Sequence, residues 1–377
     1  RLSGCLKIIF YLDKEVLKMK KLKSLLLITA FSFALTPLAM ATESAEDLFN
    51  QGVKAQDKGD YAQAAKLFEK VCQMGFANAC FNLGHLYLDG QGVKQNKTHA
   101  AKLYEKACNG GNTKSCHNLG NLYLNGQGVK QDYAQAAKLY EQACKGSDTG
   151  GCSNLGLLYE KGLGVRQDKA YAAKLYEQAC NSGIADACHN LGILHKDGQG
   201  MKQDYAQAAK LFERACNGGS TDGCYNLGNA YYNGQGVKEN YAQAAKLWEK
   251  SCHDGVADAC YNLGLLYYNG QGVKQNYSQS AKLFEQACNG GIFDGCSNLG
   301  VLYDKGQGVK QNYTQAAKLY EQACNGGFAQ GCFNLGLLYG KGQGKQRNHS
   351  TAKEYFGKAC ALGDMQGCDW YNKLKGY

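Results

Sequence analysis

The apolar residues of the chain follow the period of an α-helix, and the same arrangement returns every 36 residues. In the unit that starts at residue 77, a first helix is expected over about 77–89, with a buried stripe at Cys80, Leu83, Gly84 and Tyr87. A second helix is expected over about 97–109, with the same spacing at Ala100, Leu103, Tyr104 and Ala107. We name these helix A and helix B of a repeat. Each has one apolar face, so the pattern predicts helix pairs that bury these faces together.

Short glycine-rich segments separate the predicted helices. Residues 90–96 supply glycines for positive φ and then Asn96 at the expected start of helix B, where its side chain can cap the helix. Residues 109–111 read Asn-Gly-Gly, which is typical of a left-handed helix stop. Helix, loop, helix and turn together fill one repeat.

The cysteines mark the repeat without an insertion or deletion. They stand in pairs with seven residues between the partners: Cys72 and Cys80, Cys108 and Cys116, Cys144 and Cys152, Cys180 and Cys188, Cys216 and Cys224, Cys252 and Cys260, Cys288 and Cys296, Cys324 and Cys332, Cys360 and Cys368. This regularity predicts eight full 36-residue repeats over 76–364, with a capping hairpin at 42–75 and a capping helix at 365–377. The expected fold is an all-α solenoid of αα-hairpins.

The cysteine pairs predict nine local disulfides, each joining the end of one helix to the start of the next. In the rival pairing Cys80 bonds to Cys108, and carrying that pairing along the array leaves Cys72 and Cys368 without partners. The local pairing uses every cysteine of the repeats. Zinc is the functional alternative, but its cysteine ligands usually have two to four residues between them, and no paired histidines follow here. We therefore expect no metal site.

The region near Met19 has the features of a signal peptide. A lysine-rich start is followed by an apolar run over 25–38 and by Ala39-Met40-Ala41, a small-x-small cleavage site. We expect a cleaved signal at 19–41, a mature chain that begins at Thr42, and residues 1–18 upstream of the true start. The apolar run is short and contains Pro37, so a membrane helix is the less favoured reading.

Composition agrees with an exported protein. Nineteen cysteines are far more than a reduced cytosolic protein of this kind carries, so we expect a secreted or periplasmic location. The formal charge is +10, and removing residues 1–41 takes away seven basic and two acidic side chains and leaves +5. Such a mild excess does not point to nucleic acid. No later segment resembles a membrane span.

The repeat resembles Sel1-like repeats, which are relatives of tetratricopeptide repeats. The shared motifs are Leu-Gly-x-Leu-Tyr, Gly-x-Gly-Val and Ala-Ala-Lys-Leu-Tyr-Glu-x-Ala, and they cover about residues 45–370. The resemblance implies a right-handed, disulfide-stapled solenoid with helix A on its concave surface. The added cysteine spacing is similar to that of the Helicobacter cysteine-rich protein family, which implies penicillin binding and β-lactamase activity.

The residues themselves offer little support for such an activity. Ser350 and Lys353 match the Ser-x-x-Lys motif of serine β-lactamases, but the Ser-Asp-Asn and Lys-Thr-Gly partner motifs do not occur in the chain. The histidines are scattered over different repeats rather than clustered as zinc β-lactamases require: His85, His99, His117, His189, His195, His253 and His349. No catalytic residue and no cofactor is therefore expected.

One face of helix A combines a constant residue with variable ones. The equivalents of residues 78, 82, 85 and 89 share this face, and the second of them is always asparagine: Asn82, Asn118, Asn154, Asn190, Asn226, Asn262, Asn298 and Asn334. A constant amide beside variable side chains suits recognition of an extended peptide, with the amides bonding its main chain. The alternative is that each asparagine caps a carbonyl of a neighbouring loop.

The sequence therefore predicts a monomeric scaffold that binds a peptide or protein in its concave groove, including host components. The alternative, implied by the resemblance only, is a protein that binds and hydrolyses β-lactams or takes a cell-wall-like small molecule. A row of basic loop residues that includes Lys94 and Lys130 leaves an acidic partner open, beside the plainer role of solubility.

Overall fold

The computed structural model describes residues 44–374, and all regular structure among them is helical. Helices α2–α20 follow one another along these residues. The expected signal peptide at 19–41 and the residues before it lie outside the described part of the chain. The chain divides at a repeat boundary into two compact units, Arg1–Asn112 and Thr113–Tyr377.

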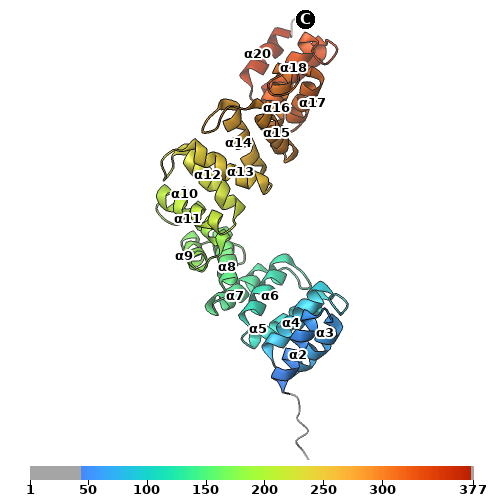
Figure 1. The fold of residues 1–377 in the computed structure, drawn as a ribbon, viewed down its shortest axis with the longest axis vertical. Coiled ribbons are helices and arrows are strands. Elements are labelled where there is room, and N and C mark those ends of the chain that lie inside the picture. The colour runs from blue at the N-terminus through green and yellow to red at the C-terminus, as the bar shows by residue number, and fades with distance from the viewer. Residues whose placement is uncertain (1–43, 375–377) are drawn as a thin grey trace, which may run out of the picture. The chain divides into compact units, whose positions relative to one another are not determined.

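The first unit contains two helical hairpins (Figure 1). Helices α2 (Ala45–Asp57) and α3 (Tyr61–Gln73) form a hairpin in the segment expected to cap the array. Helices α4 (Ala77–Asp89) and α5 (Lys97–Asn109) are helix A and helix B of the first repeat. Both have the bounds that the apolar period predicts.

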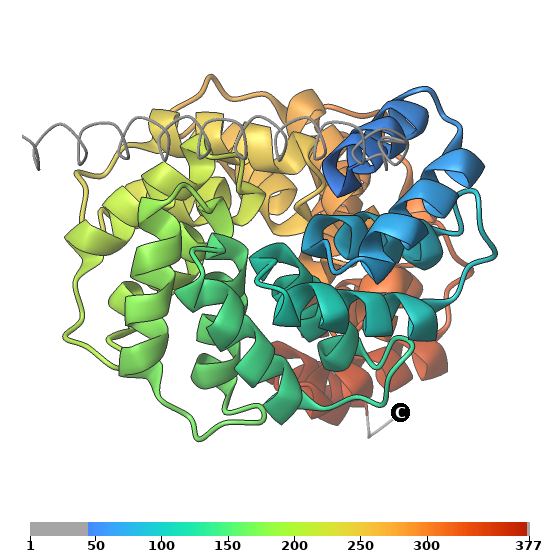
Figure 2. The same ribbon diagram turned by 90° about the horizontal axis from the view of Figure 1, so that it is seen from below.

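The second unit continues the alternation of helices A and B through seven further repeats (Figure 2). Its helices A are α6 (Thr113–Asn125), α8 (Thr149–Lys161), α10 (Ala185–Asp197), α12 (Thr221–Asn233), α14 (Ala257–Asn269), α16 (Phe293–Lys305) and α18 (Ala329–Lys341). Its helices B are α7 (Tyr133–Lys145), α9 (Lys169–Asn181), α11 (Tyr205–Asn217), α13 (Tyr241–His253), α15 (Tyr277–Asn289), α17 (Tyr313–Asn325) and α19 (His349–Ala361), and α20 (Met365–Lys373) closes the unit. Within residues 44–374, no helix is long and apolar enough to cross a membrane.

An asparagine or aspartate caps every helix B, as the sequence predicts. The side chain of Asn96 accepts a hydrogen bond from the His99 backbone N–H, and Asp132 does the same with Gln135. In six of the repeats a glutamine also holds the loop before the cap: Gln95, for example, donates to the Leu88 carbonyl at the end of helix A. Caps of this kind stabilise a helix by about 1 kcal/mol, so each repeat specifies its own helix start.

Glycine in helix A lets helix B approach closely. A Cβ added to Gly84 would lie 2.6 Å from the Tyr104 ring, and one added to Gly120 would lie equally close to Tyr140. The same relation joins the glycine and the aromatic residue in the later repeats. The Leu-Gly-x-Leu-Tyr motif therefore exists because a ring from helix B fills the space that a side chain would take.

The buried face of helix A differs in one position from the expected stripe. Leu86 is buried, whereas Tyr87, which we expected in the core, is only half-buried. Ala79 is also fully buried. Helix A packs against its own helix B and against the preceding helix B, so its buried face is wider than one stripe.

The disulfides join the end of each helix B to the start of the next helix A. Their Cα–Cα distances are 4.4–4.7 Å, within the usual range. The pairs are Cys72–Cys80, Cys144–Cys152, Cys180–Cys188, Cys216–Cys224, Cys252–Cys260, Cys288–Cys296, Cys324–Cys332 and Cys360–Cys368. Cys108 and Cys116 are disulfide-bonded as well. Within each unit, short covalent links thus join successive repeats.

Candidate binding surface

The eight asparagines singled out by the sequence form what we call the asparagine row. All of them lie in the middle of a helix A and are half-buried: Asn82, Asn118, Asn154, Asn190, Asn226, Asn262, Asn298 and Asn334. The residue three positions later, which varies between repeats, is half-buried in every repeat too. The row is therefore neither core nor fully solvated surface.

Three hollows lie along the row in the second unit, between α10 and α16. The first, of 180 Å³, is lined among others by Phe212, Asn226, Asn229 and Asn233. The second, of 210 Å³, is lined by Asn229, Tyr232, Asn233, Trp248, Asn262 and Leu265. The third, of 170 Å³, is lined by Leu265, Tyr268, Asn269, Phe284, Asn298 and Val301. Neighbouring hollows share lining residues, so the three follow one another along the helices A, and we call them together the groove.

Each hollow is built from equivalent positions of successive repeats. A residue of the asparagine row, the variable residue after it and the ring that helix B packs on the helix-A glycine all contribute: Asn262, Leu265 and Trp248 in the second hollow. The aromatic walls come from helix B and from the next-to-last residue of helix A, such as Tyr232 and Tyr268. The groove therefore offers apolar walls and amides at the spacing of the repeat.

Asn154 and Asn226 both bond to the preceding helix A. The Asn154 Nδ2 lies 3.1 Å from His117 Nε2 and donates to Asn121 Oδ1 over 3.2 Å. The Asn226 Nδ2 lies 3.0 Å from His189 Nε2 and donates to the Asp222 carbonyl of its own helix. Neither amide bonds to a loop carbonyl, so these contacts give no support to the loop-capping alternative. They tie adjacent helices A together along the row.

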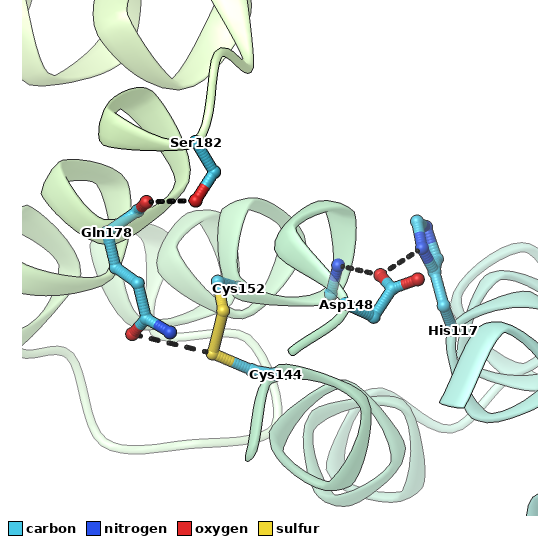
Figure 3. The surroundings of a disulfide bond; sticks show 7 residues. His117, Cys144, Asp148, Cys152, Gln178 and Ser182 are labelled. Atoms are coloured by element: carbon cyan, nitrogen blue, oxygen red, sulfur yellow. Dashed lines mark hydrogen bonds and ion pairs between the residues drawn. A yellow bond between two sulfur atoms is a disulfide. The ribbon is translucent and has the colours of Figure 1, made fainter. Parts of the chain in front are cut away.

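His117 belongs to a polar network at a repeat boundary (Figure 3). Its Nδ1 lies 2.8 Å from Asp148 Oδ1, and the same carboxylate accepts the Gly151 N–H to cap α8. Burial opposes ionisation of Asp148, but the hydrogen bonds from His117 and Gly151 outweigh it and lower the pKa of this carboxyl. A deprotonated Asp148 fixes the proton on His117 Nδ1, which leaves Nε2 free to accept from Asn154.

His189 occupies the position of His117 two repeats later. Burial lowers the pKa of His189 and outweighs the opposing effect of Asp222. The imidazole is therefore neutral at neutral pH and can accept the hydrogen bond of Asn226.

The buried tyrosines of helix B keep their protons. Burial raises the pKa of Tyr140 and of Tyr176, and each hydroxyl donates to a side chain of helix A: Tyr140 to Asn121 over 2.6 Å and Tyr176 to Glu160 over 2.7 Å. These neutral hydroxyl groups donate hydrogen bonds that link helix B to helix A of the same repeat.

The β-lactamase-like motif does not assemble a visible site. Ser350 is exposed and Lys353 is half-buried on the first turn of α19, and neither bonds to another described side chain. In residues 44–374, no group of three or more His, Cys, Asp or Glu side chains could hold a metal ion.

Sequence reasoning found the asparagine row but missed the aromatic walls. Tyr232 and Tyr268 stand at a position occupied by Leu, Glu, Lys, Asp or Gly in other repeats, so no constant pattern marks them. Their role depends on a helix B ring from the same repeat, which only the packing reveals. Two consecutive repeats with a Tyr-Tyr pair, 231–232 and 267–268, were the available signal.

The comparison with protein families gives nine matches to the Sel1 repeat. They cover residues 45–76, 77–112, 113–148, 150–184, 185–220, 221–256, 257–292, 294–328 and 329–364. The first match falls on the hairpin α2–α3, so the segment expected to cap the array has the sequence of a repeat itself. The family expectation drawn from the motifs is confirmed over most of the chain.

Curated relatives match over short stretches. The Helicobacter pylori protein named "Putative beta-lactamase HcpC" (strain J99) is 42% identical over 57 residues, which are 15% of this chain and 20% of that protein. "Beta-lactamase HcpA" of the same strain is 39% identical over 54 residues, 14% of this chain and 22% of that protein. The chain spans about a fifth of the length of the curated relatives it matches.

Solved structures agree in fold over most of the chain. A protective antigen present in uropathogenic Escherichia coli strains, c5321, has a TM-score of 0.71 at 26% identity and covers 84% of this chain and 77% of its own. A Sel1 repeat protein from Oxalobacter formigenes has a TM-score of 0.61 at 23% identity, with 91% of this chain and 99% of its own covered. The second similarity shows the fold alone.

Proposed function

The chain belongs to the Sel1 repeat family, and from this premise we propose that it is a protein-binding scaffold which holds an extended peptide, or an extended segment of a protein, against its helices A. Amides of the row without a partner among the described residues, such as Asn262, donate and accept hydrogen bonds to the main chain of the ligand, whereas Asn226 accepts through Oδ1 because its Nδ2 is already engaged. The variable residues between these amides contact the side chains of the ligand and determine which sequences bind. The scaffold acts as a monomer and needs no cofactor.

The observation that carries the proposal is the groove of three hollows. Each hollow is about the size of a few side chains, and each repeats the same set of an amide, a variable residue and a ring. In the second hollow, the side-chain amides of Asn229, Asn233 and Asn262 have no hydrogen-bond partner among the described residues. They are therefore available to a ligand. An extended chain has an unpaired N–H and C=O at nearly every residue and supplies partners at this spacing.

The experiment is a screen of the oxidised protein against a peptide array, followed by affinity measurement on two matched variants. We expect N226A/N262A/N298A, which empties the row in the hollows, to bind selected peptides more weakly by about 1 kcal/mol per site, roughly fivefold each. The control N217A/N289A/N325A removes three asparagines from the exposed ends of helices B and should bind like the wild type.

Thermal unfolding of the same variants separates recognition from stability. A triple row variant that unfolds at a lower temperature but binds with unchanged affinity would show that the asparagines hold the scaffold together and do not contact the ligand. Binding that depends on the row, with helicity and unfolding temperature preserved, supports the groove.

We also propose that the protein works outside the cytoplasm, either secreted or in the periplasm. The disulfides support this location, because such bonds persist in oxidising compartments. The signal-like segment at 19–41 adds to it. Expression in a bacterium with an intact secretion pathway, followed by N-terminal sequencing, should give a chain that begins at Thr42. An uncleaved chain in the cytoplasmic fraction would contradict the proposal.

The β-lactam alternative has the names of the Helicobacter relatives in its favour, and these matches cover about a seventh of this chain. Turnover of a chromogenic cephalosporin by the purified protein is its direct test.

A further inference from the structure

The helices A that line the three hollows also carry a row of acidic residues. Each of α10, α12, α14 and α16 has an aspartate as its second residue, and we call these the acidic row: Asp186, Asp222, Asp258 and Asp294. The first three are exposed and Asp294 is half-buried. Among the described residues, no basic side chain forms an ion pair with any of them.

The four helices A that line the hollows are together more negative than the other four helices A. Helices α10, α12, α14 and α16 contain six acidic and two basic residues, a net charge of −4, while the whole chain carries +10. The other four helices A contain two acidic and three basic residues. At the position of the acidic row those helices have Asn78, Lys114, Gly150 and Gln330.

Helix capping does not account for this distribution. An acidic residue in the first turn favours a helix whose N-terminus lacks a cap, and α10, α14 and α16 have no side-chain cap. However, α4 and α18 also lack one and have no acid at this position, whereas α12 is capped by Ser220 and still has Asp222. The aspartates follow the hollows, not the missing caps.

The acidic row runs parallel to the groove at a short distance from it. Asp222 and Asn226 are one turn apart on the same face of α12, about 6 Å along the helix axis. Asp258 and Asn262, and likewise Asp294 and Asn298, have the same relation. None of the aspartates lines a hollow, but Asp222, Asp258 and Asp294 each lie one turn from an asparagine that does, so a lysine side chain of a ligand in the hollows can extend towards them.

The spacing of the repeats selects a conformation for the ligand. Helices α10 and α12 contact one another, with Asn226 Nδ2 at 3.0 Å from His189 Nε2, and helices that pack against one another lie about 8–10 Å apart. A polyproline II helix advances about 3.1 Å per residue with three residues per turn, so every third side chain points the same way at intervals of about 9.3 Å. A β-strand turns every third side chain to the opposite face and fits this row less well.

Resting on the proposed function, we propose that the groove of repeats 4–7 takes a polyproline II segment with Lys or Arg at every third position. The basic side chains pair with the acidic row. The residues between them pack against the aromatic walls at Tyr232, Trp248 and Tyr268, as proline-rich ligands do in aromatic-lined grooves. The main chain of such a helix has no internal hydrogen bonds, so it is free to bond to the asparagine row.

The test uses a labelled twelve-residue peptide with the repeat Lys-Pro-Pro and two relatives of it. One replaces every Lys by Gln, and the other gathers the four lysines at one end without changing composition. Binding is measured by fluorescence anisotropy to wild type, to D222N/D258N/D294N and to the control E213Q/E249Q/E285Q. The control removes the same charge from exposed positions of helices B.

We expect the wild type to prefer Lys-Pro-Pro over both relatives and to lose affinity as salt is raised. Each exposed ion pair contributes a factor of about 1.5 to 5, so the acidic-row variant should bind about tenfold more weakly and the control within about twofold of the wild type. An acidic-row variant that binds as tightly as the wild type overturns the inference, and so does equal binding of the Gln or clustered-Lys peptide, or no binding of Lys-Pro-Pro.

The outcomes keep this inference apart from the proposed function. One outcome is that array peptides lose affinity for the variant at Asn226, Asn262 and Asn298 but bind the acidic-row variant as tightly as the wild type. That result supports the scaffold proposal and refutes the basic ligand. Failure of every peptide to bind refutes both. Competition by a neutral oligosaccharide such as chitohexaose, unaffected by the aspartate changes, assigns the hollows to a different class of ligand and also overturns the inference.

Discussion

The disulfides should stabilise the chain one repeat at a time, and removal of a single bond tests this. We consider C288A/C296A, because both residues are buried and join α15 to α16 inside the second unit. The bond closes a loop of about nine residues, for which the chain-entropy relation gives about 2.5 kcal/mol. Loss of the two sulfur atoms from the core adds on the order of 1 kcal/mol.

The destabilisation should be local, because each repeat contacts only its neighbours. A single unfolding free energy describes such an array poorly, so native-state hydrogen exchange is the suitable assay. In the variant, the free energy of opening measured for amides of α15 and α16 should fall by about 2–4 kcal/mol, so these amides exchange faster. Amides of α6 and α7 should keep their wild-type rates. Wild-type protein treated with a reductant serves as a control in which protection falls at every repeat boundary.

Two results would refute this reasoning. A change below about 0.5 kcal/mol at α15 and α16 would mean that the unfolded chain gains almost no freedom when the bond is absent. An equal loss along the whole second unit would mean that the repeats unfold together. Peptide mapping without reductant should also find only local links, and a Cys80–Cys108 bond would contradict the pairing.

Three further predictions follow from particular side chains. In α18, G336A should destabilise by about 1–3 kcal/mol because its Cβ would lie 2.7 Å from the buried Phe356 ring. G340A should instead stabilise by up to about 1 kcal/mol, because its Cβ would make only an ordinary contact of 3.9 Å with Ala352; thermal unfolding compares the two. Burial lowers the pKa of His189, so the unfolded state takes up a proton at a higher pH than the folded state does. The free energy of unfolding of the wild type should therefore fall as the pH drops below about 6.5. H189F should lose less stability between about pH 7.5 and 5.0, again measured by thermal unfolding. Replacing Ser350 and Lys353 with Ala should leave any cephalosporin turnover unchanged, and a large loss with the fold intact would point to the hydrolase.

The fold was predictable because its determinants lie within one repeat. The bounds of helices A and B follow from the apolar period, and each cap, such as Asn96, acts on a residue three positions away. The disulfide partners are eight residues apart in the sequence. Tyr87 was expected in the core but is half-buried at its border, where its ring packs edge-on against His99 of the same repeat.

The groove was only partly predictable because it is made between repeats. The constant Asn226 could be predicted from the sequence. The walls of the second hollow, however, include Tyr232 and Trp248 of one repeat and Asn262 and Leu265 of the next. A pattern that compares equivalent positions finds what is constant. Such a comparison misses side chains that differ between repeats, because these form the wall of a hollow only where the neighbouring residues are small enough to leave space.

Stability and recognition meet at the start of helix A. In α12 the acidic Asp222 stands two residues before Cys224, whose disulfide ties this first turn to the preceding helix B. First turns fray readily because their N–H groups have no partners within the helix, and a frayed turn would hold Asp222 at no fixed distance from the groove. The covalent link keeps that turn ordered before a ligand arrives, which reduces the entropy lost on binding. The same bonds that stabilise the repeats therefore also preorganise the edge of the groove, and reduction should weaken binding at salt and temperature where the helices persist.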